Sequence, residues 1–369
     1  MHRCSKEPAL ADYRPRSRLR LPAHEVPRAR FPAIDAHNHL GRWLHPDGDW
    51  AARELSGSRN DMDWAAPSVP ELLRTMDECG VEAVVNLDGG WGAELRANLD
   101  RYDRAHPGRF HTFCQLDWSL LREPDGVPRL LRGLADSVAE GARGLKVWKT
   151  LGLHVRDGAG DLMLPDDECL ADLWDAAGAL GIPVLIHVAD PSAFFDPADE
   201  RNERLEILRA HPDWSYADSG FPRHERLLAA LDTVLGRHPG TVFVGAHVAS
   251  CADDLGLVDR MLDEHPNLRV DIGARIADLG RQPRAARRLL LRHPDRVLFG
   301  TDHFPPNRTE YARYFRFLET DDEQFPYSDD DPPGFGRWDI SALDLPDEVL
   351  RAVYRDNALT LLTPKEKLS

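Results

Sequence analysis

The sequence predicts an α/β protein, a (β/α)8 TIM barrel with long loops at the C-terminal mouth of the barrel. Short apolar segments alternate eight times with helical patterns, and apolar runs of this kind form parallel strands that are covered on both faces. The length of 369 residues suits one barrel with insertions. No G-x-G-x-x-G loop follows the first strand, although an open dinucleotide-binding sheet would favour one there.

The eight expected strands cover residues 33–39, 83–87, 110–116, 144–148, 184–188, 242–246, 269–272 and 297–300. Ser68 and Glu71 form an S-x-x-E capping box before the first helix, and Gly80 follows that helix. Apolar residues spaced by three and four predict further helices over 129–140, 167–180, 225–237, 255–264 and 283–292.

Three long insertions follow strands one, five and eight, over residues 40–67, 189–222 and 303–339. The loops that follow barrel strands lie at the C-terminal mouth, where barrel enzymes keep their chemistry. The insertions are rich in aromatic residues, so we expect them to form a lid that excludes water. Trp43 and His303 closely follow polar strand ends and are therefore candidates for substrate contact.

The formal net charge of −16 argues against non-specific binding to nucleic acid or anionic membranes. No apolar run approaches the roughly 18 residues of a membrane span. Residues 1–32 are basic and interrupted by proline, without the apolar region of a signal peptide. We expect them to form an N-terminal arm packed on a barrel of residues 33–369. The five cysteines form no C-x-x-C pair, which favours a reducing cytoplasm.

Polar residues end several of the predicted strands. His37 and His39 end the first strand and share one face, because side chains alternate along a strand. His187 closes strand five, His247 strand six and Asp302 strand eight. Buried imidazoles and carboxylates need partners, and one metal ion would satisfy all of them together.

The chain resembles the amidohydrolase superfamily, and most closely its amidohydrolase-2 branch of aminocarboxymuconate-semialdehyde decarboxylase-like metal-dependent hydrolases. The phrases that carry the resemblance are Ile34-Asp-Ala-His-Asn-His39, Pro183-Val-Leu-Ile-His187, Gly245-Ala-His247 and Phe299-Gly-Thr-Asp302. The resemblance implies that His37, His39, His187 and Asp302 hold one divalent ion, and that His247 is an acid/base group. A homodimer is an expectation by analogy only.

Three imidazoles and a carboxylate leave one position open for water, as catalytic zinc sites do. Zinc is our first expectation, although manganese, iron or cobalt accept the same donors. A bound metal makes hydroxide available near neutral pH, and Asp302 and His247 would transfer its proton. The sequence therefore predicts a hydrolase acting on an amide, a lactone or a related carboxyl derivative.

Two alternatives remain open. The same residues would serve a non-oxidative decarboxylase, a carboxy-lyase whose small-molecule substrate bears a carboxylate and is often aromatic. A barrel that binds a metal or ligand without catalysis is the other alternative, although five polar residues at four strand ends argue against lost chemistry.

Two cations are candidates for substrate binding. Lys146 lies within strand four and has three open roles: a carboxylated bridge between two ions, a cation for an acidic substrate, or a partner of Asp302. We expect an unmodified ammonium, because the four-ligand set needs no second ion. Lys149 is expected in a loop. Arg275 follows strand seven, where its guanidinium would bind a substrate carboxylate or pair with Asp271.

Overall fold

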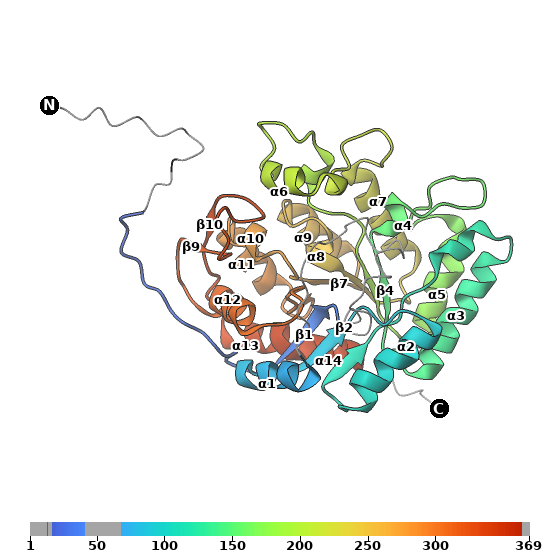
Figure 1. Cartoon of the computed structure of the whole chain (residues 1–369), viewed down its shortest axis with the longest axis horizontal. Helices are drawn as coiled ribbons and strands as arrows, with labels where there is room; N and C mark the ends of the chain where they lie inside the picture. Colours follow the sequence, from blue (N-terminus) through green and yellow to red (C-terminus); the bar gives the residue numbers. More distant parts are fainter. Residues whose placement is uncertain (1–12, 14–16, 41–67, 364–369) are drawn as a thin grey trace.

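The computed structural model describes residue 13 and residues 17–40 and 68–363 of the chain. Parallel strands gather at the centre of the molecule with helices around them (Figure 1). They are β1 (Ala33–Asn38), β2 (Val81–Asn86), β3 (Phe110–Thr112), β4 (Leu145–Val147), β5 (Val184–Ile186), β6 (Phe243–Gly245), β7 (Leu268–Asp271) and β8 (Val297–Leu298).

The eight strands close into a barrel. Parallel pairing joins β1 to β3 in one run and β4 to β8 in another. A single parallel bridge at Cys114 connects the two runs between β3 and β4. On the other side, Ala36 N donates to Phe299 O at 2.9 Å and Asp302 N donates to His37 O at 2.8 Å, which joins β8 to β1. The predicted (β/α)8 fold is confirmed.

The principal helices surround these strands. They are α1 (Val69–Cys79), α2 (Gly92–Leu99), α3 (Gly126–Glu140), α5 (Ala171–Leu180), α7 (His224–Arg237), α9 (Leu255–Glu264), α11 (Pro283–Arg292) and α12 (Arg308–Glu319). Shorter helices are α4 (Thr150–Leu153), α6 (Leu205–Ala210), α8 (Ala246–Ala249), α10 (Ile276–Leu279), α13 (Asp347–Arg351) and α14 (Asn357–Leu362). The predicted capping box of Ser68 and Glu71 is present at α1, and Gly80 ends that helix in the left-handed conformation. None of the helices in the described part of the chain is long and apolar enough to span a membrane.

The insertion after β8 contains more regular structure than its composition suggested. It holds α12 and a short antiparallel pair, β9 (Phe325–Pro326) and β10 (Asp339–Ile340). Tyr314 and Phe315 of α12 are buried, and their rings lie 6.0 and 5.8 Å from the ring of Phe299 at the end of β8. These two aromatic residues of the insertion therefore belong to the hydrophobic core.

The described part of the N-terminal arm has no regular secondary structure and is mostly exposed. His24 N and His24 Nδ1 lie 2.8 and 2.6 Å from the carboxylate of Asp322. Arg30 N donates to Glu319 Oε1 at 2.9 Å. The arm thus joins the barrel through the end of α12 and the residues that follow it.

Candidate metal centre

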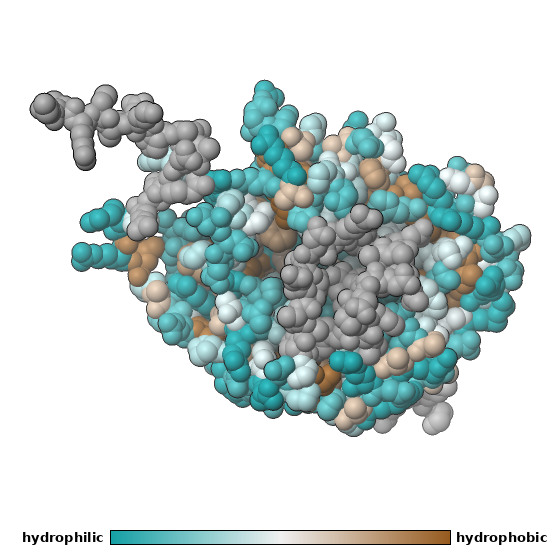
Figure 2. All heavy atoms as spheres, in the orientation of Figure 1, coloured by the Kyte–Doolittle hydropathy of each residue, from teal (hydrophilic) through white to brown (hydrophobic). Residues whose placement is uncertain are grey.

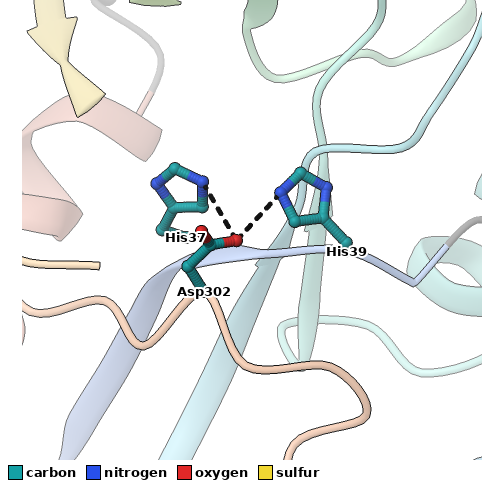
Figure 3. A group of neighbouring side chains, drawn as sticks. All are labelled: His37, His39 and Asp302. Carbon is teal, nitrogen blue, oxygen red and sulfur yellow. Dashed lines mark ion pairs between the residues drawn. The ribbon is translucent and has the colours of Figure 1, made fainter. Parts of the chain in front are cut away.

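Three of the predicted ligands meet at the C-terminal end of the barrel. His37 Nε2 lies 3.5 Å and His39 Nε2 3.2 Å from Asp302 Oδ1 (Figure 3). All three donor atoms lie within 4.8 Å of one another. The two imidazoles come from the end of β1 and share a face because strand residues alternate, while Asp302 follows β8.

Both imidazoles are anchored from behind by carboxylates. His37 Nδ1 lies 2.9 Å from Asp271 Oδ2, and His39 Nδ1 lies 2.8 Å from Asp88 Oδ1. A carboxylate only accepts hydrogen bonds, so each Nδ1 carries a proton, and Nε2 of each ring, when neutral, keeps a lone pair. Although burial alone would raise the pKa of Asp271, His37 lowers it to about 2. This outer layer of carboxylates orients imidazole ligands in many metalloproteins.

The environment of His37 fits a metal ion. Its Nε2 is buried and makes no hydrogen bond to any residue that the structure describes. The carboxylate that faces this Nε2 is Asp302, at 3.5 Å, and despite burial the neighbouring imidazoles hold the pKa of this carboxyl well below its usual range. A lone pair facing a carboxylate is repulsive unless a cation lies between them. Two imidazole nitrogens and a carboxylate oxygen suit a divalent ion such as zinc.

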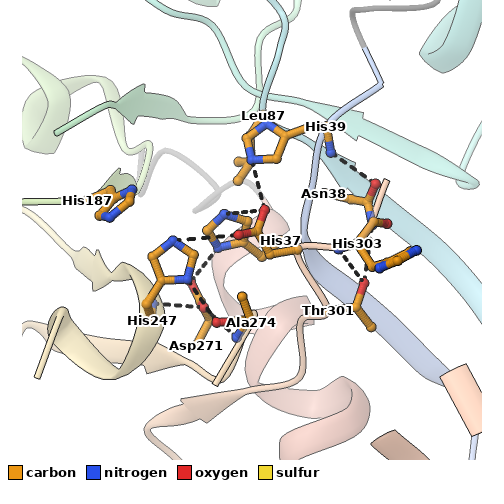
Figure 4. A network of polar contacts seen from close by, with 12 residues as sticks. His37, Asn38, His39, Leu87, His187, His247, Asp271, Ala274, Thr301 and His303 are labelled. Atoms are coloured by element: carbon orange, nitrogen blue, oxygen red, sulfur yellow. Dashed lines mark hydrogen bonds and ion pairs between the residues drawn. The ribbon is translucent and has the colours of Figure 1, made fainter. Parts of the chain in front are cut away.

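His187 lies beside this group and is not one of its three members. Its ring is 4.4 Å from the ring of His247, centroid to centroid (Figure 4). His187 Nε2 lies 3.1 Å from Ala189 O. A carbonyl oxygen only accepts, so Nε2 carries the proton and the lone pair of a neutral ring is on Nδ1.

His247 faces the same centre. Its Nδ1 lies 2.8 Å from Gly273 O, which only accepts, so the lone pair is on Nε2. That Nε2 is 3.8 Å from Asp302 Oδ2, whereas His37 and His39 pair with Oδ1. Burial, with the charge of Arg275 as the next cause, holds the pKa of His247 well below its usual range. The residue is therefore neutral in the metal-free protein and presents a basic nitrogen to Asp302.

Two of these residues have unusual backbone conformations. His247 has φ of 58° and Asp302 has φ of 54°, in the left-handed region that non-glycine residues rarely adopt. Strain of this kind persists where the surrounding structure imposes it and often accompanies functional sites. It also explains why both residues lie beyond the ends of the short strands β6 and β8.

The centre opens into a pocket of about 160 Å³ with aromatic walls. Phe304 follows β8, and Trp148 follows β4; their ring centroids lie 5.4 and 4.7 Å from that of His39. Phe194 and Trp214 belong to the insertion after β5, and Phe335 to the one after β8. The insertions after β5 and β8 thus contribute aromatic side chains to the mouth. Trp43 lies outside the described residues.

Of the predicted substrate cations, only Arg275 lines this pocket. It is 5% exposed, donates to Ala274 O at 2.8 Å and forms no ion pair with any residue in the described ranges. The alternative partner, Asp271, binds His37 instead. Lys146 is completely buried, and its Nζ has no hydrogen-bond partner in the described part of the chain. Burial lowers the pKa of Lys146 to about 8.

The structure places two further side chains. Lys149 lies in the turn after β4, as expected for a loop residue, and from there it lines the pocket and pairs with Asp190. His303 does not belong to the described lining, and its ring is turned away from His37 and His247 (Figure 4). Its neighbour Phe304 lines the pocket instead. At this position a left-handed Asp302 redirects the chain, which strand alternation could not predict.

A family model described as amidohydrolase matches residues 34–363. The chain belongs to the amidohydrolase family. Within it the chain falls in the amidohydrolase-2 branch, which contains hydrolases and carboxy-lyases, and it is therefore an enzyme of one of these two types. No curated protein matches the chain.

Several solved structures share the fold of this amidohydrolase. A dihydroxybenzoic acid decarboxylase of a Polaromonas species, with bound manganese and 2-nitroresorcinol, is 16% identical with a TM-score of 0.55, over 90% of this chain and 97% of that one. A 2,6-dihydroxybenzoate decarboxylase from Rhizobium is 17% identical with a TM-score of 0.52, over 90% and 98%. A zinc-containing amidohydrolase from Burkholderia multivorans is 16% identical with a TM-score of 0.51, over 90% and 99%. At such identities the likeness establishes the barrel and not the substrate.

Sequence reasoning gave Asp88 no role in this amidohydrolase site, and it named Asp271 only as the alternative partner of Arg275. Asp88 follows β2, and Asp271 is the last residue of β7. Both are buried polar residues at strand ends, and that signal was available in the sequence. The order of strands around the barrel decides that Asp271 faces His37 and Asp88 faces His39. That order is known only from the structure.

Proposed function

We propose that this amidohydrolase is a metal-dependent hydrolase that cleaves an amide, a lactone or a related carboxyl derivative. The observation that carries the proposal is the convergence of His37 Nε2, His39 Nε2 and Asp302 Oδ1 beside a pocket. Carboxylates anchor both imidazoles from behind. A preorganised and anchored donor set of this kind is what a catalytic ion requires.

His37, His39 and Asp302 would hold one divalent ion, with His187 as the fourth ligand and zinc as the first candidate. When bound, the ion supplies Lewis acidity, which polarises a substrate oxygen and makes hydroxide available near neutral pH. The solved Polaromonas and Burkholderia multivorans structures contain manganese and zinc respectively, so both metals belong in the first test.

The side chains around this centre supply proton transfer and binding. The lone pair of His247 Nε2 accepts a proton from the attacking water, and Asp302 Oδ2, 3.8 Å away, stabilises the imidazolium that forms. His247 then returns the proton to the leaving group. Arg275 binds an anionic group of the substrate, while the aromatic walls pack against it and limit access of water.

A carboxy-lyase is the second candidate, favoured by the walls of the pocket. Trp148, Phe304 and Phe335 would suit a planar aromatic acid, and Arg275 would hold its carboxylate. Dihydroxybenzoate decarboxylases share the fold. In this case His247 would deliver a proton to the carbon that loses CO₂.

Metal analysis tests the centre that both candidates share. Purified protein should contain about one divalent ion per chain, and His37→Ala and Asp302→Ala should each lose it. Native metal content in both variants would refute the assignment. Because His37 and Asp302 come from opposite ends of the chain, their joint effect would also show that the ion is bound at the closure between β1 and β8.

A substrate panel then separates the two candidates. Amides, lactones and aromatic carboxylic acids should be incubated with the metal-loaded enzyme, with His37→Ala as the blank. Formation of a new carboxylate from a lactone or an amide, without release of CO₂, supports hydrolysis. Release of CO₂ with loss of the substrate carboxylate would replace the hydrolase proposal by the carboxy-lyase.

A further inference from the structure

A buried ion pair forms one wall of the pocket next to His187. Lys149 follows β4 and Asp190 follows β5, and these neighbouring strands bring the two residues together. Lys149 Nζ is bonded to Asp190 Oδ2, and the two side chains are 11% and 10% exposed. The ring of Tyr216, itself buried, lies with its centroid 5.8 Å from the same Nζ.

This pair is costly to build. Removing two charges from water costs several kcal/mol per ion, and their attraction often only offsets that cost. Burial lowers the pKa of Lys149, but the adjacent Asp190 carboxylate outweighs burial and raises it above its usual range. Lys149 is therefore charged at neutral pH. Because such a pair adds little stability, its effect on the neighbouring residues is the better reason for its presence here.

Asp190 is the carboxylate beside His187, but it lies farther from this imidazole than Asp271 and Asp88 lie from theirs. Asp190 Oδ1 lies 3.7 Å from His187 Nε2, while its other oxygen is held by Lys149. The anchors of His37 and His39 lie at 2.9 and 2.8 Å. His187 thus has the most distant carboxylate of the three, and Ala189 O accepts the proton of Nε2 directly.

We propose that Asp190, held in place by Lys149, is a positioning residue for His187. Its negative charge beside Nε2 favours the ring orientation in which the N–H points to Ala189 O and Nδ1 remains available as the fourth metal-binding atom. Lys149 fixes the carboxylate and prevents it from turning into the pocket toward the substrate. This inference rests on the proposed metal centre and adds two residues to it that do not bind the ion.

The test measures metal affinity by competition with a chromophoric chelator, using zinc and the purified enzyme. Asp190→Asn keeps the shape of the side chain and removes its charge. It should weaken affinity by about 10-fold, the low end of the effect of losing a hydrogen-bonded outer partner, because Asp190 lies 3.7 Å from His187 Nε2. Lys149→Met should act in the same direction, whereas Lys149→Arg retains a cationic donor for Asp190 and should restore affinity. Asp196→Asn, on an exposed residue of the same insertion, is the matched control.

A second measurement separates positioning from a purely structural role. Cobalt-loaded Asp190→Asn should show altered visible absorption bands, because the geometry around the ion changes when His187 turns. Native affinity and native bands in Asp190→Asn would overturn the inference. Equal affinities of the Met and Arg variants at Lys149 would also overturn it, and this comparison decides the matter if Asp190→Asn does not fold. His37→Ala distinguishes the two proposals: if it too retains the ion, the metal centre itself is wrong.

Discussion

The partner of one ring nitrogen determines what each histidine of this site can do. His37 and His39 donate Nδ1–H to carboxylates, and His247 donates it to a backbone carbonyl, so all three present Nε2 to the centre. Asp302 lies between them and uses Oδ1 toward the β1 pair and Oδ2 toward His247. In the proposed mechanism, Asp302 therefore uses Oδ1 to bind the ion and Oδ2 to assist proton transfer at His247.

His247→Ala tests this separation of roles. The variant should retain the ion, because the donor atoms of His37, His39 and Asp302 form a group without it. Turnover should fall by about 10²- to 10⁴-fold, the usual loss for one acid/base group. The measurement is metal content together with kcat on whichever substrate the panel identifies. Loss of the ion would make His247 a ligand, and native turnover would remove it from the mechanism.

Lys146→Met tests the buried ammonium. In the metal-free protein burial lowers the pKa of Lys146 from 10.5 to about 8, a difference that corresponds to about 3 kcal/mol. The unfolded chain then binds more protons than the folded one between these values, so this group makes the native protein more stable as pH rises from about 8 to 10.5.

Denaturant unfolding of metal-free wild type and Lys146→Met across that range is the measurement. The variant should be more stable at pH 7, and the difference should disappear as the pH reaches 10.5. Metal stoichiometry should be unchanged, because a single unbridged ion does not involve this side chain. Parallel pH profiles would show that Lys146 is not a buried ammonium, and a halved metal content in the variant would favour a carboxylated bridge.

At the scale of elements, the close approach of β8 to β1 builds the site. A Cβ added at Gly300 would lie 2.8 Å from His37 Cβ and 3.1 Å from His37 N. Only glycine at this position lets the chain after β8 approach β1 at His37, the first of the proposed ligands. The H-x-H phrase, the strand-end histidines and Asp302 were visible in the sequence, since polar residues interrupt apolar strands. The need for Gly300 was not, because it depends on a contact between residues 263 positions apart in the chain.

Gly300→Ala should therefore disturb both stability and metal binding. Overpacking of a tight interior contact usually costs about 1–3 kcal/mol, and the displaced β1 would move His37 relative to Asp302. Denaturant unfolding and chelator competition measure the two effects. Gly240→Ala is the control, because an added methyl group there meets nothing within 4 Å. Equal behaviour of the two variants would show that the barrel absorbs the contact by relaxing elsewhere.

At the scale of the whole molecule, closure of the barrel brings β1 and β8 together. The N-terminal arm packs against the end of α12 and the residues that follow it. The expectation of an arm packed on the barrel came from composition alone, which cannot give its contacts. Within the described part of the arm, the contacts begin at His24, which binds buried Asp322. They continue at Arg30, whose backbone N–H bonds to buried Glu319.

Two truncations test how the arm contributes. Removal of residues 1–22 deletes a segment whose described side chains are exposed, so stability should change by less than about 0.5 kcal/mol. Removal of residues 1–31 also deletes His24 and Arg30, and each buried carboxylate that loses a partner should cost about 1–3 kcal/mol. It deletes buried Ala29 as well, whose N donates to Cys79 O at 2.9 Å, and this adds to the loss. Asp322 keeps Arg316 and Glu319 keeps Tyr354, so the loss should be partial and the barrel should still fold. Both forms should bind the ion, because His37 and Asp302 lie beyond the deleted residues. Equal stability of the two truncated forms would show that the contacts at His24 and Arg30 are incidental, and that the barrel is complete without its arm.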